Sequence, residues 1–235
     1  MQGLYKVEMQ TIGGSRRGVF YAYDRKLLGG NSAFSYVGTF RNLSSGEVSA
    51  DISVQRHRED PNFQSLLDID RLTLKLRGWP SGEAFRFEGG AEELPDTAFV
   101  LVMTPISEES AIPPMAVGQN PLANGLYALD AEMFDGVAGG GNAGVLVLLD
   151  GMMRGGDGSF GYVGSYTSGD GRWKGEAVVR EHSPTHGNRL LFGGREVGIG
   201  YSGTYNDAGG QLQCMALNGK RSIRYGAVMK KLADG

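Results

Sequence analysis

Two histidines and a set of glycines in the second half of the chain have spacings that could support chemistry. His182 and His186 form an H-x-x-x-H pair, which on a helix would present two imidazoles to one metal ion. A proline lies between them and no third ligand is evident, so we expect a pair of turn histidines and no metal site. Gly139, Gly141 and Gly144 fit G-x-G-x-x-G, but the run that follows reads as a strand and not as the helix that a dinucleotide site requires. We therefore expect a hairpin loop there and no cofactor.

The remaining reactive side chains favour structural roles. His57 and His182 end the similar stretches V-Q-R-H (54–57) and V-R-E-H (179–182). This recurrence indicates a shared structural role, such as a hydrogen bond at the end of a strand. The alternative is a role in a functional pocket. Cys214 lies on the apolar face of a predicted strand, which is typical of a buried, inert thiol. No serine has an identifiable His–Asp set beside it. We predict a non-enzymatic protein with no catalytic residues.

Composition narrows the class of protein. The chain has 235 residues, a net charge of −3, 21% charged residues and one cysteine. A net negative charge argues against a general nucleic-acid binder, and the lack of any apolar run of about 18 residues argues against a membrane-spanning helix. A single cysteine cannot form an internal disulfide, and the first ten residues lack the apolar core of a signal peptide. We expect a cytoplasmic protein that binds neither nucleic acid nor membranes.

One unusual phrase occurs twice. GGNSAFSYVGTF occupies 29–40 and GGDGSFGYVGSY occupies 155–166, an offset of 126. G-L-Y, V-x-x-H and V-M recur in the same order at nearly the same offset, which indicates an internal duplication. Four of the eight prolines fall between residues 105 and 121, so the sequence predicts a first repeat at 1–105, a Pro-rich linker at 106–123 and a second repeat at 124–235.

Each copy shows the alternation of half-buried strands. Phe34 and Tyr36 point one way along their strand, as do Phe160 and Tyr162 in the second copy, with small or polar residues between them. With almost no helix to cover a sheet, each sheet is expected to close on itself, so the chain is predicted to be all-β, with two tandem antiparallel barrels of about eight strands each. A two-sheet sandwich is the alternative. The one helical pattern lies at 60–72.

The order G-L-Y, GG-N/D-x-x-x-x-Y-x-G, V-x-R-H and SLLDIDRLTLKL resembles the GrlR family of small negative regulators of type III secretion. The resemblance covers most of the first copy and, more thinly, the second. It implies a lipocalin-like barrel in each half and a protein partner that is a transcription regulator. Because members of that family pair as homodimers, it also implies that the two repeats form a pseudo-dimer within one chain.

The type regulator of that family holds its partner with an acidic run just after the phrase. Here the corresponding stretches carry scattered acids, Glu47 and Asp51 in the first copy and Asp170 and Glu176 in the second, which we take as candidates for a partner-facing loop. The leading hypothesis is a regulatory protein that binds a protein partner. The alternative is a carrier of a small apolar ligand, and its predicted lining residues are Phe34, Tyr36, Phe160, Tyr162, His57 and His182.

Overall fold

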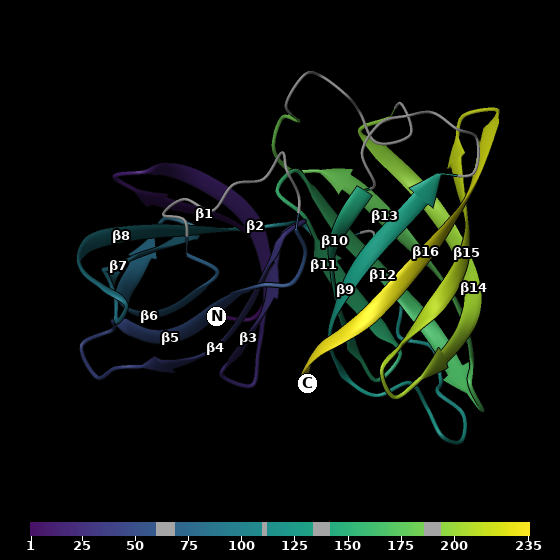
Figure 1. Cartoon of the computed structure of the whole chain (residues 1–235), viewed down its shortest axis with the longest axis horizontal. Coiled ribbons are helices and arrows are strands. Elements are labelled where there is room, and N and C mark those ends of the chain that lie inside the picture. The colour runs from purple at the N-terminus through teal and green to yellow at the C-terminus, as the bar shows by residue number, and fades with distance from the viewer. Residues whose placement is uncertain (60–68, 110–111, 134–141, 186–193) are drawn as a thin grey trace.

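The computed structural model describes residues 1–59, 69–109, 112–133, 142–185 and 194–235, and every regular element in them is a strand (Figure 1). The first barrel consists of β1 (Gly3–Thr11), β2 (Gly14–Tyr23), β3 (Lys26–Gly30), β4 (Phe34–Asn42), β5 (Val48–Arg56), β6 (Arg71–Ser81), β7 (Ala84–Ala91) and β8 (Leu94–Pro105). The second consists of β9 (Gly125–Met133), β10 (Asn142–Leu149), β11 (Met152–Gly156), β12 (Phe160–Gly169), β13 (Arg172–Glu181), β14 (Glu196–Asn206), β15 (Gly209–Asn218) and β16 (Arg221–Asp234).

The predicted fold class is confirmed: the chain forms two closed, eight-stranded antiparallel barrels in tandem. Each strand pairs with the next along the chain, and β8 and β16 close their barrels by pairing with β1 and β9. Residues 60–68, which hold most of the predicted helix, lie outside the described residues, and β6 begins at Arg71. None of the described residues belongs to a helix long and apolar enough to cross a membrane.

Alternation along the strands fills the two interiors. In β5 every second residue from Val48 to Val54 is buried, and β13 does the same through Trp173, Ala177 and Val179. Each set joins the core of its own barrel. The period of two therefore produces barrels that are packed with their own side chains, because each strand turns one face inward along its whole length.

A third apolar cluster joins the barrels through the outer faces of their first strands. Along β2 the residues from Val19 to Ala22 are all buried: Phe20 and Ala22 face the barrel interior, whereas Val19 and Tyr21 face the other barrel. We call this cluster the seam. Its fully buried members are Leu4, Val19, Tyr21 and Leu28 from the first barrel and Leu126, Val145, Val147 and Val163 from the second.

The seam repeats the internal duplication. Val19 and Val145 are counterparts at the offset of 126, and so are Gly30 and Gly156. A Cβ added to Gly30 would lie 3.0 Å from Cγ1 of Val145, and one added to Gly156 would lie 2.8 Å from Cγ1 of Val19. Each valine thus packs on the glycine of the opposite repeat, which is the reciprocal contact of a two-fold interface. Both glycines have φ of 152°, where a side chain would also be strained.

The segment predicted to be a linker packs against the second barrel. The backbone N–H of Gly118 donates to the carbonyl of Ser168, 2.7 Å away, and the hydroxyl of Thr167 donates to the carbonyl of Ala116, 2.6 Å away. Leu122, only 2% exposed, belongs to the core of the second barrel. These contacts show that the described part of the segment is held in place and is not a free spacer.

A partly buried ion pair ties that segment to both barrels. Glu108 accepts a hydrogen bond from the backbone N–H of Leu4 in the first barrel and pairs with the guanidinium of Arg154 in the second. Arg154 has a side chain only 7% exposed and also donates to the carbonyls of Met153 and Gly164. The counterpart of Arg154 in the first repeat is Leu28, a member of the seam. At this position the second repeat therefore has a charged residue where the first has an apolar one.

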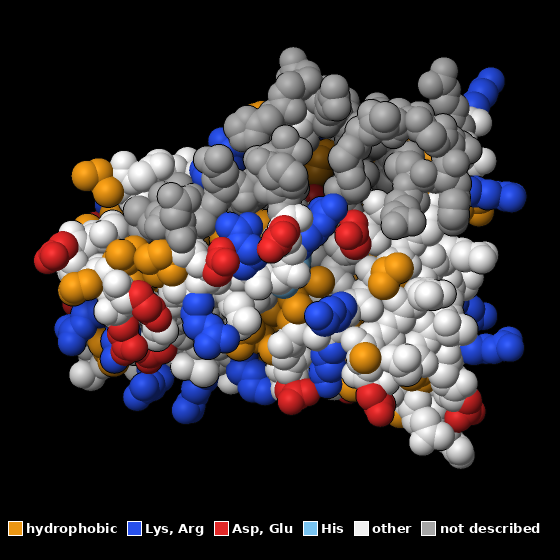
Figure 2. Space-filling view, in the orientation of Figure 1, with side chains coloured by type: hydrophobic (Ala, Val, Ile, Leu, Met, Phe, Trp, Pro, Cys, Tyr) orange, Lys and Arg blue, Asp and Glu red, His pale blue; other side chains and the backbone are white. Residues whose placement is uncertain are grey.

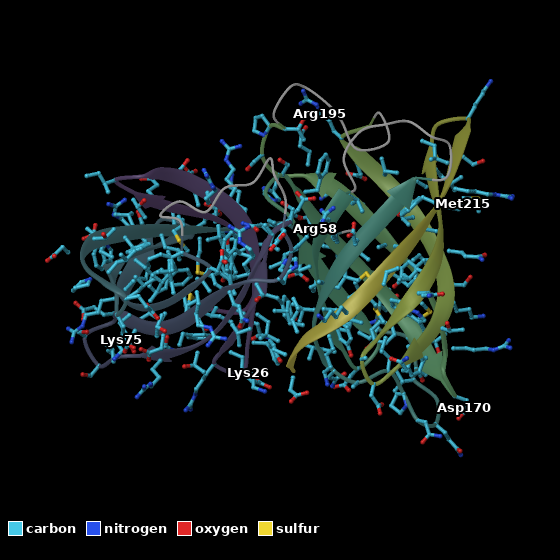
Figure 3. The ribbon with its side chains drawn as sticks, viewed as in Figure 1. Lys26, Arg58, Lys75, Asp170, Arg195 and Met215 are labelled. Atoms are coloured by element: carbon cyan, nitrogen blue, oxygen red, sulfur yellow. The ribbon has the colours of Figure 1, made fainter. Side chains whose placement is uncertain are left out.

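Further polar contacts cross between the barrels. The ammonium of Lys26 donates to the carbonyl of Gly235, 2.6 Å away, and Arg58 pairs with Asp130 at 3.5 Å. Figure 3 shows Lys26 and Arg58 in the region between the two barrels. Together with the seam, they fix one side of the second barrel against the first and leave β14 and β15 on the side that faces away from it (Figure 1).

Candidate functional site

The repeated phrase builds one polar loop in each barrel. In the first, the buried side chain of Asn31 accepts hydrogen bonds from the backbone N–H groups of Ala33 and Phe34 at 3.0 and 2.9 Å. Its amide nitrogen donates to the hydroxyl of Tyr36, 2.8 Å away, and to the carbonyl of Arg17. The amide of Asn31 therefore closes the turn after the glycine pair and fixes the position of the Tyr36 hydroxyl.

Asp157 performs the same task in the second barrel with a carboxylate. It accepts from the backbone N–H groups of Ser159 and Phe160 at 2.7 and 2.9 Å, and from the hydroxyl of Tyr162 at 2.7 Å. Burial raises the pKa of Asp157, and these hydrogen bonds act against that rise. The pKa of Tyr162 is raised by burial and by the neighbouring carboxylate. The recurrence of the phrase thus has a structural cause, because both loops need this side chain.

The structure places His57 and His182 beside these loops and not inside the barrels. Nε2 of His57 lies 3.2 Å from the carbonyl oxygen of Asn31, and Nε2 of His182 lies 3.3 Å from that of Asp157. Burial lowers the pKa of both, that of His182 to about 4. Both rings are therefore neutral near pH 7 and close the loops by hydrogen bonds at the strand ends.

The four aromatic residues proposed to line the barrels lie in the two cores. Phe34 and Tyr36 belong to the first core, and Phe160 and Tyr162 to the second. Tyr162 borders a cavity of about 60 Å³ inside the second barrel, whose wall also contains Tyr201, Tyr225, Cys214 and aliphatic residues. Ligand pockets are roughly 300–1,000 Å³. This cavity is therefore too small for the ligand that a carrier would hold.

Cys214 is buried, and burial raises the pKa of its thiol to about 11. This environment keeps it protonated and unreactive. His186, Gly139 and Gly141 lie outside the described residues, whereas Gly144 lies in β10. Among the residues that the structure describes, no group of three His, Cys, Asp or Glu side chains could hold a metal ion.

The four scattered acids do not form one loop. Glu47 and Asp170 occupy the equivalent β4–β5 and β12–β13 turns, but Asp51 lies in β5, 3.6 Å from Arg41, and Glu176 lies in β13. The prediction of a partner-facing loop is thus wrong for Asp51 and Glu176, because the turns are shorter than the sequence indicated. Glu176 nevertheless points outward on the exposed wall of the second barrel.

That wall carries a shallow trough along β14. The outward residues of β14 are Gly198, Gly200, Ser202 and Thr204, all small and exposed. Longer side chains flank them, since β13 places Val178, Glu176, Lys174 and Arg172 on one side and β15 places Leu217, Met215, Gln213 and Gln211 on the other. We call these twelve residues the β14 trough. No atom lies within 4 Å of a Cβ built on Gly198 or Gly200, so the floor of the trough is open.

Apolar side chains are exposed at one end of the trough. Leu217 is 56% and Met215 41% exposed at this end, whereas Val228 on β16, 51% exposed, pairs with Gln211 at the other end. Figure 3 shows Met215 on the side of the second barrel away from the first. At the other end, Arg172 and Lys174 are exposed, and neither forms an ion pair with any residue that the structure describes. The trough is therefore apolar at one end and cationic at the other.

The first barrel carries charges at the same positions. Register places Thr73 and Lys75 of β6 where the second barrel has Gly198 and Gly200, and Glu92 where it has Leu217. In the first barrel, Lys75 and Glu92 form an ion pair of 2.7 Å. The duplication thus provides an internal comparison: an ion-paired wall in one copy corresponds to a glycine floor with an exposed leucine in the other.

An open pocket of about 860 Å³ occupies the cationic end of the same wall. Its lining includes exposed residues such as Arg172, Lys174 and Gln213. It also includes Trp173, Leu212 and Ala227, which belong to the core of the second barrel. Figure 2 shows Lys and Arg side chains projecting from the outer edge of the second barrel.

Comparison with known proteins assigns no family. No family model matches the chain, and no curated protein matches it. A solved structure that does match is described as a "putative outer membrane protein" from Bacteroides fragilis; it is 10% identical, with 98% of this chain and 96% of that chain covered, at a TM-score of 0.24. A likeness at this level supports no conclusion about this chain.

Sequence reasoning missed the trough, although signals for it were present. The stretch from Cys214 to Leu217 has no polar residue, so both faces of that strand are apolar and one of them is exposed. The run GIGYSG places small residues, Gly198, Gly200 and Ser202, at every second position. A strand whose apolar or small residues occupy the outward face indicates a contact surface.

Proposed function

We propose that this chain is a non-enzymatic, cytoplasmic regulatory protein that acts by binding a protein partner. The observation that supports this most is the exposed apolar wall of the second barrel, formed by the neighbouring side chains of Met215 and Leu217. Contiguous exposed apolar residues on a folded protein mark interaction sites. The first repeat carries an ion pair at the corresponding place, so the barrel itself does not require an apolar surface there.

The class of partner comes from the family resemblance. Regulators of the GrlR type bind a transcription regulator, and we propose the same class of partner here. The acidic run used by the type regulator is missing, so the proposed contact is a different surface. The seam joins the two barrels on one side of the second barrel. The apolar wall on the other side would therefore be presented to the partner by a rigid pair of barrels.

The test is affinity purification from the native host with the full chain as bait. Leu217→Lys combined with Met215→Lys should abolish recovery of the partner, because both changes place charges on the apolar wall. Ile12→Lys is the matched control, since Ile12 is 95% exposed but lies on the first barrel. Wild type and control should enrich the same protein. Recovery that is equal for all three baits, or that never exceeds background, would contradict the proposal.

The alternative function, a carrier of a small apolar ligand, receives less support. The cavity inside the second barrel is about 60 Å³, enough for water molecules but well below the roughly 300–1,000 Å³ of ligand pockets. Native mass spectrometry of the purified chain tests this directly. A bound small molecule in stoichiometric amount would favour the carrier over the interaction protein.

A further inference from the structure

We propose that the β14 trough binds an extended segment of a partner protein, with aliphatic side chains at one end and acidic side chains at the other. The inference rests on the proposed function and adds the place and the chemistry of the contact. It follows from three features of the wall: its shape, its charge and its difference from the first barrel.

The shape of the trough fits an extended chain. Its floor runs from Gly198 to Thr204 along a strand that rises about 3.4 Å per residue, so it is about 20 Å long. That length matches about six residues of extended polypeptide. β14 is hydrogen-bonded on both sides to β13 and β15, so an occupant cannot add as a further strand and must be held by its side chains.

The two ends of the trough select different side chains. Leu217 and Met215 flank Gly198 and Gly200, and with a floor that lacks side chains they leave space for aliphatic groups. Lys174 and Arg172 flank Ser202 and Thr204, with the uncharged Gln213 and Gln211 opposite. Carboxylates of the occupant would face these two cations. Glu176 is the one acidic residue of the trough, so an acidic side chain is disfavoured at its middle.

Other partners fit these features less well. Proteins that bind single-stranded nucleic acid stack bases on exposed aromatic rings, and the twelve residues of the trough include none. The apolar residues lie beside a groove and not at a protruding tip, which suits an inserted segment more than a lipid surface. The complementarity of two cations with a partner's carboxylates therefore favours an acidic protein segment.

The test uses the full-length chain and fluorescein-labelled octapeptides. Each peptide has a Leu/Val half and a Glu/Asp half, made in both orders, and a control peptide replaces the acids by lysine. Fluorescence anisotropy at low salt should show binding of an acidic peptide in one order and at least tenfold weaker binding of the lysine peptide. Raising the salt concentration should weaken the acidic complex.

Two kinds of variant locate the binding. Arg172→Glu with Lys174→Glu reverses the charged end, and Gly200→Gln fills the floor at a position where a side chain meets nothing. Each should weaken binding of the acidic peptide at least tenfold. Arg77→Glu is the control, because Arg77 is the exposed counterpart of Ser202 on the first barrel, and it should change binding less than twofold. Circular dichroism should show every variant folded.

The outcomes separate this inference from the proposed function. Equal binding of acidic and lysine peptides, or acidic binding that the trough variants leave unchanged, would overturn the inference. So would tighter binding of oligothymidine or of phosphatidylserine vesicles than of the acidic peptides. If a partner recovered from the host is lost with Leu217→Lys and Met215→Lys but binds the Arg172→Glu/Lys174→Glu and Gly200→Gln variants as well as wild type, the inference fails and the proposed function stands. If no partner is recovered, the proposed function fails whatever the peptides show.

Discussion

The reciprocal packing of Val19 and Val145 makes a quantitative prediction about the seam. Both side chains are 0% exposed and belong to opposite barrels. Val→Ala removes two methyl groups, and at about 0.8 kcal/mol per buried methylene plus a cavity contribution each variant should lower the free energy of unfolding by about 2 kcal/mol. Each valine touches the glycine beside the other, so the two cavities adjoin. The double variant should depart from the sum of the single effects by about 0.5 kcal/mol or more.

Urea unfolding followed by circular dichroism measures this double-mutant cycle. The matched control is Val54→Ala with Val179→Ala, another repeat-related pair whose side chains face the interiors of separate barrels. Those two variants should be additive to within about 0.3–0.5 kcal/mol, because they share no neighbours. If the Val19 and Val145 variants are as additive as the control pair, the valines do not share a packing environment and the seam as described is wrong.

Three further predictions follow from buried polar groups. Burial lowers the pKa of His182 from 6.5 to about 4, so as the pH falls the unfolded chain binds a proton before the folded chain does. The free energy of unfolding should therefore fall by about 3 kcal/mol between pH 6.5 and pH 4. Urea titrations should find this loss in wild type and not in His182→Gln. An equal loss in both would contradict it. Glu108→Gln should lower the free energy of unfolding, measured by thermal denaturation, by about 3 kcal/mol, because it leaves the buried Arg154 without its ionic partner. The double variant that adds Arg154→Leu should recover most of that loss. No recovery would refute the role of the pair. The thiol of Cys214, with a pKa of about 11, should react with a disulfide reagent at pH 8 at least a hundredfold more slowly in the native state than in 6 M guanidinium, and comparable rates would show that it is exposed.

The fold was accessible from the sequence because each strand has to turn one face inward. Alternation through Phe34 and Tyr36, and again through Phe160 and Tyr162, predicted which residues would fill each barrel, and the absence of helices predicted that each sheet would close. The repeated phrase predicted the tandem arrangement. The phrase occurs in both copies because the turn after each glycine pair needs a side chain, such as that of Asn31, that accepts hydrogen bonds from two backbone N–H groups.

The contact between the barrels could not be predicted from alternation alone, although the sequence held a signal for it. GVFYAY from Gly18 and GVLVLL from Gly144 are apolar at every position, which is typical of strands buried on both faces. A period of two describes only the inward face of such strands, so it conceals the seam. The roles of Glu108 and Arg154 depend on the meeting of three segments distant in sequence, so no local pattern could reveal them. The β14 trough could be recognised only once the strand register of both barrels was known, because it is seen by comparing the corresponding walls of the two repeats.

The central claim is that one wall of the second barrel is covered by the first barrel and the opposite wall is open. Thiol labelling of single cysteines placed in a Cys214→Ala background tests it most directly. At Val145→Cys, the account predicts that labelling occurs only through unfolding, because Val145 is 0% exposed, whereas at Leu217→Cys, 56% exposed in the native chain, labelling should be as fast as in a free peptide. Labelling of Val145→Cys as fast as that of Leu217→Cys would contradict the account.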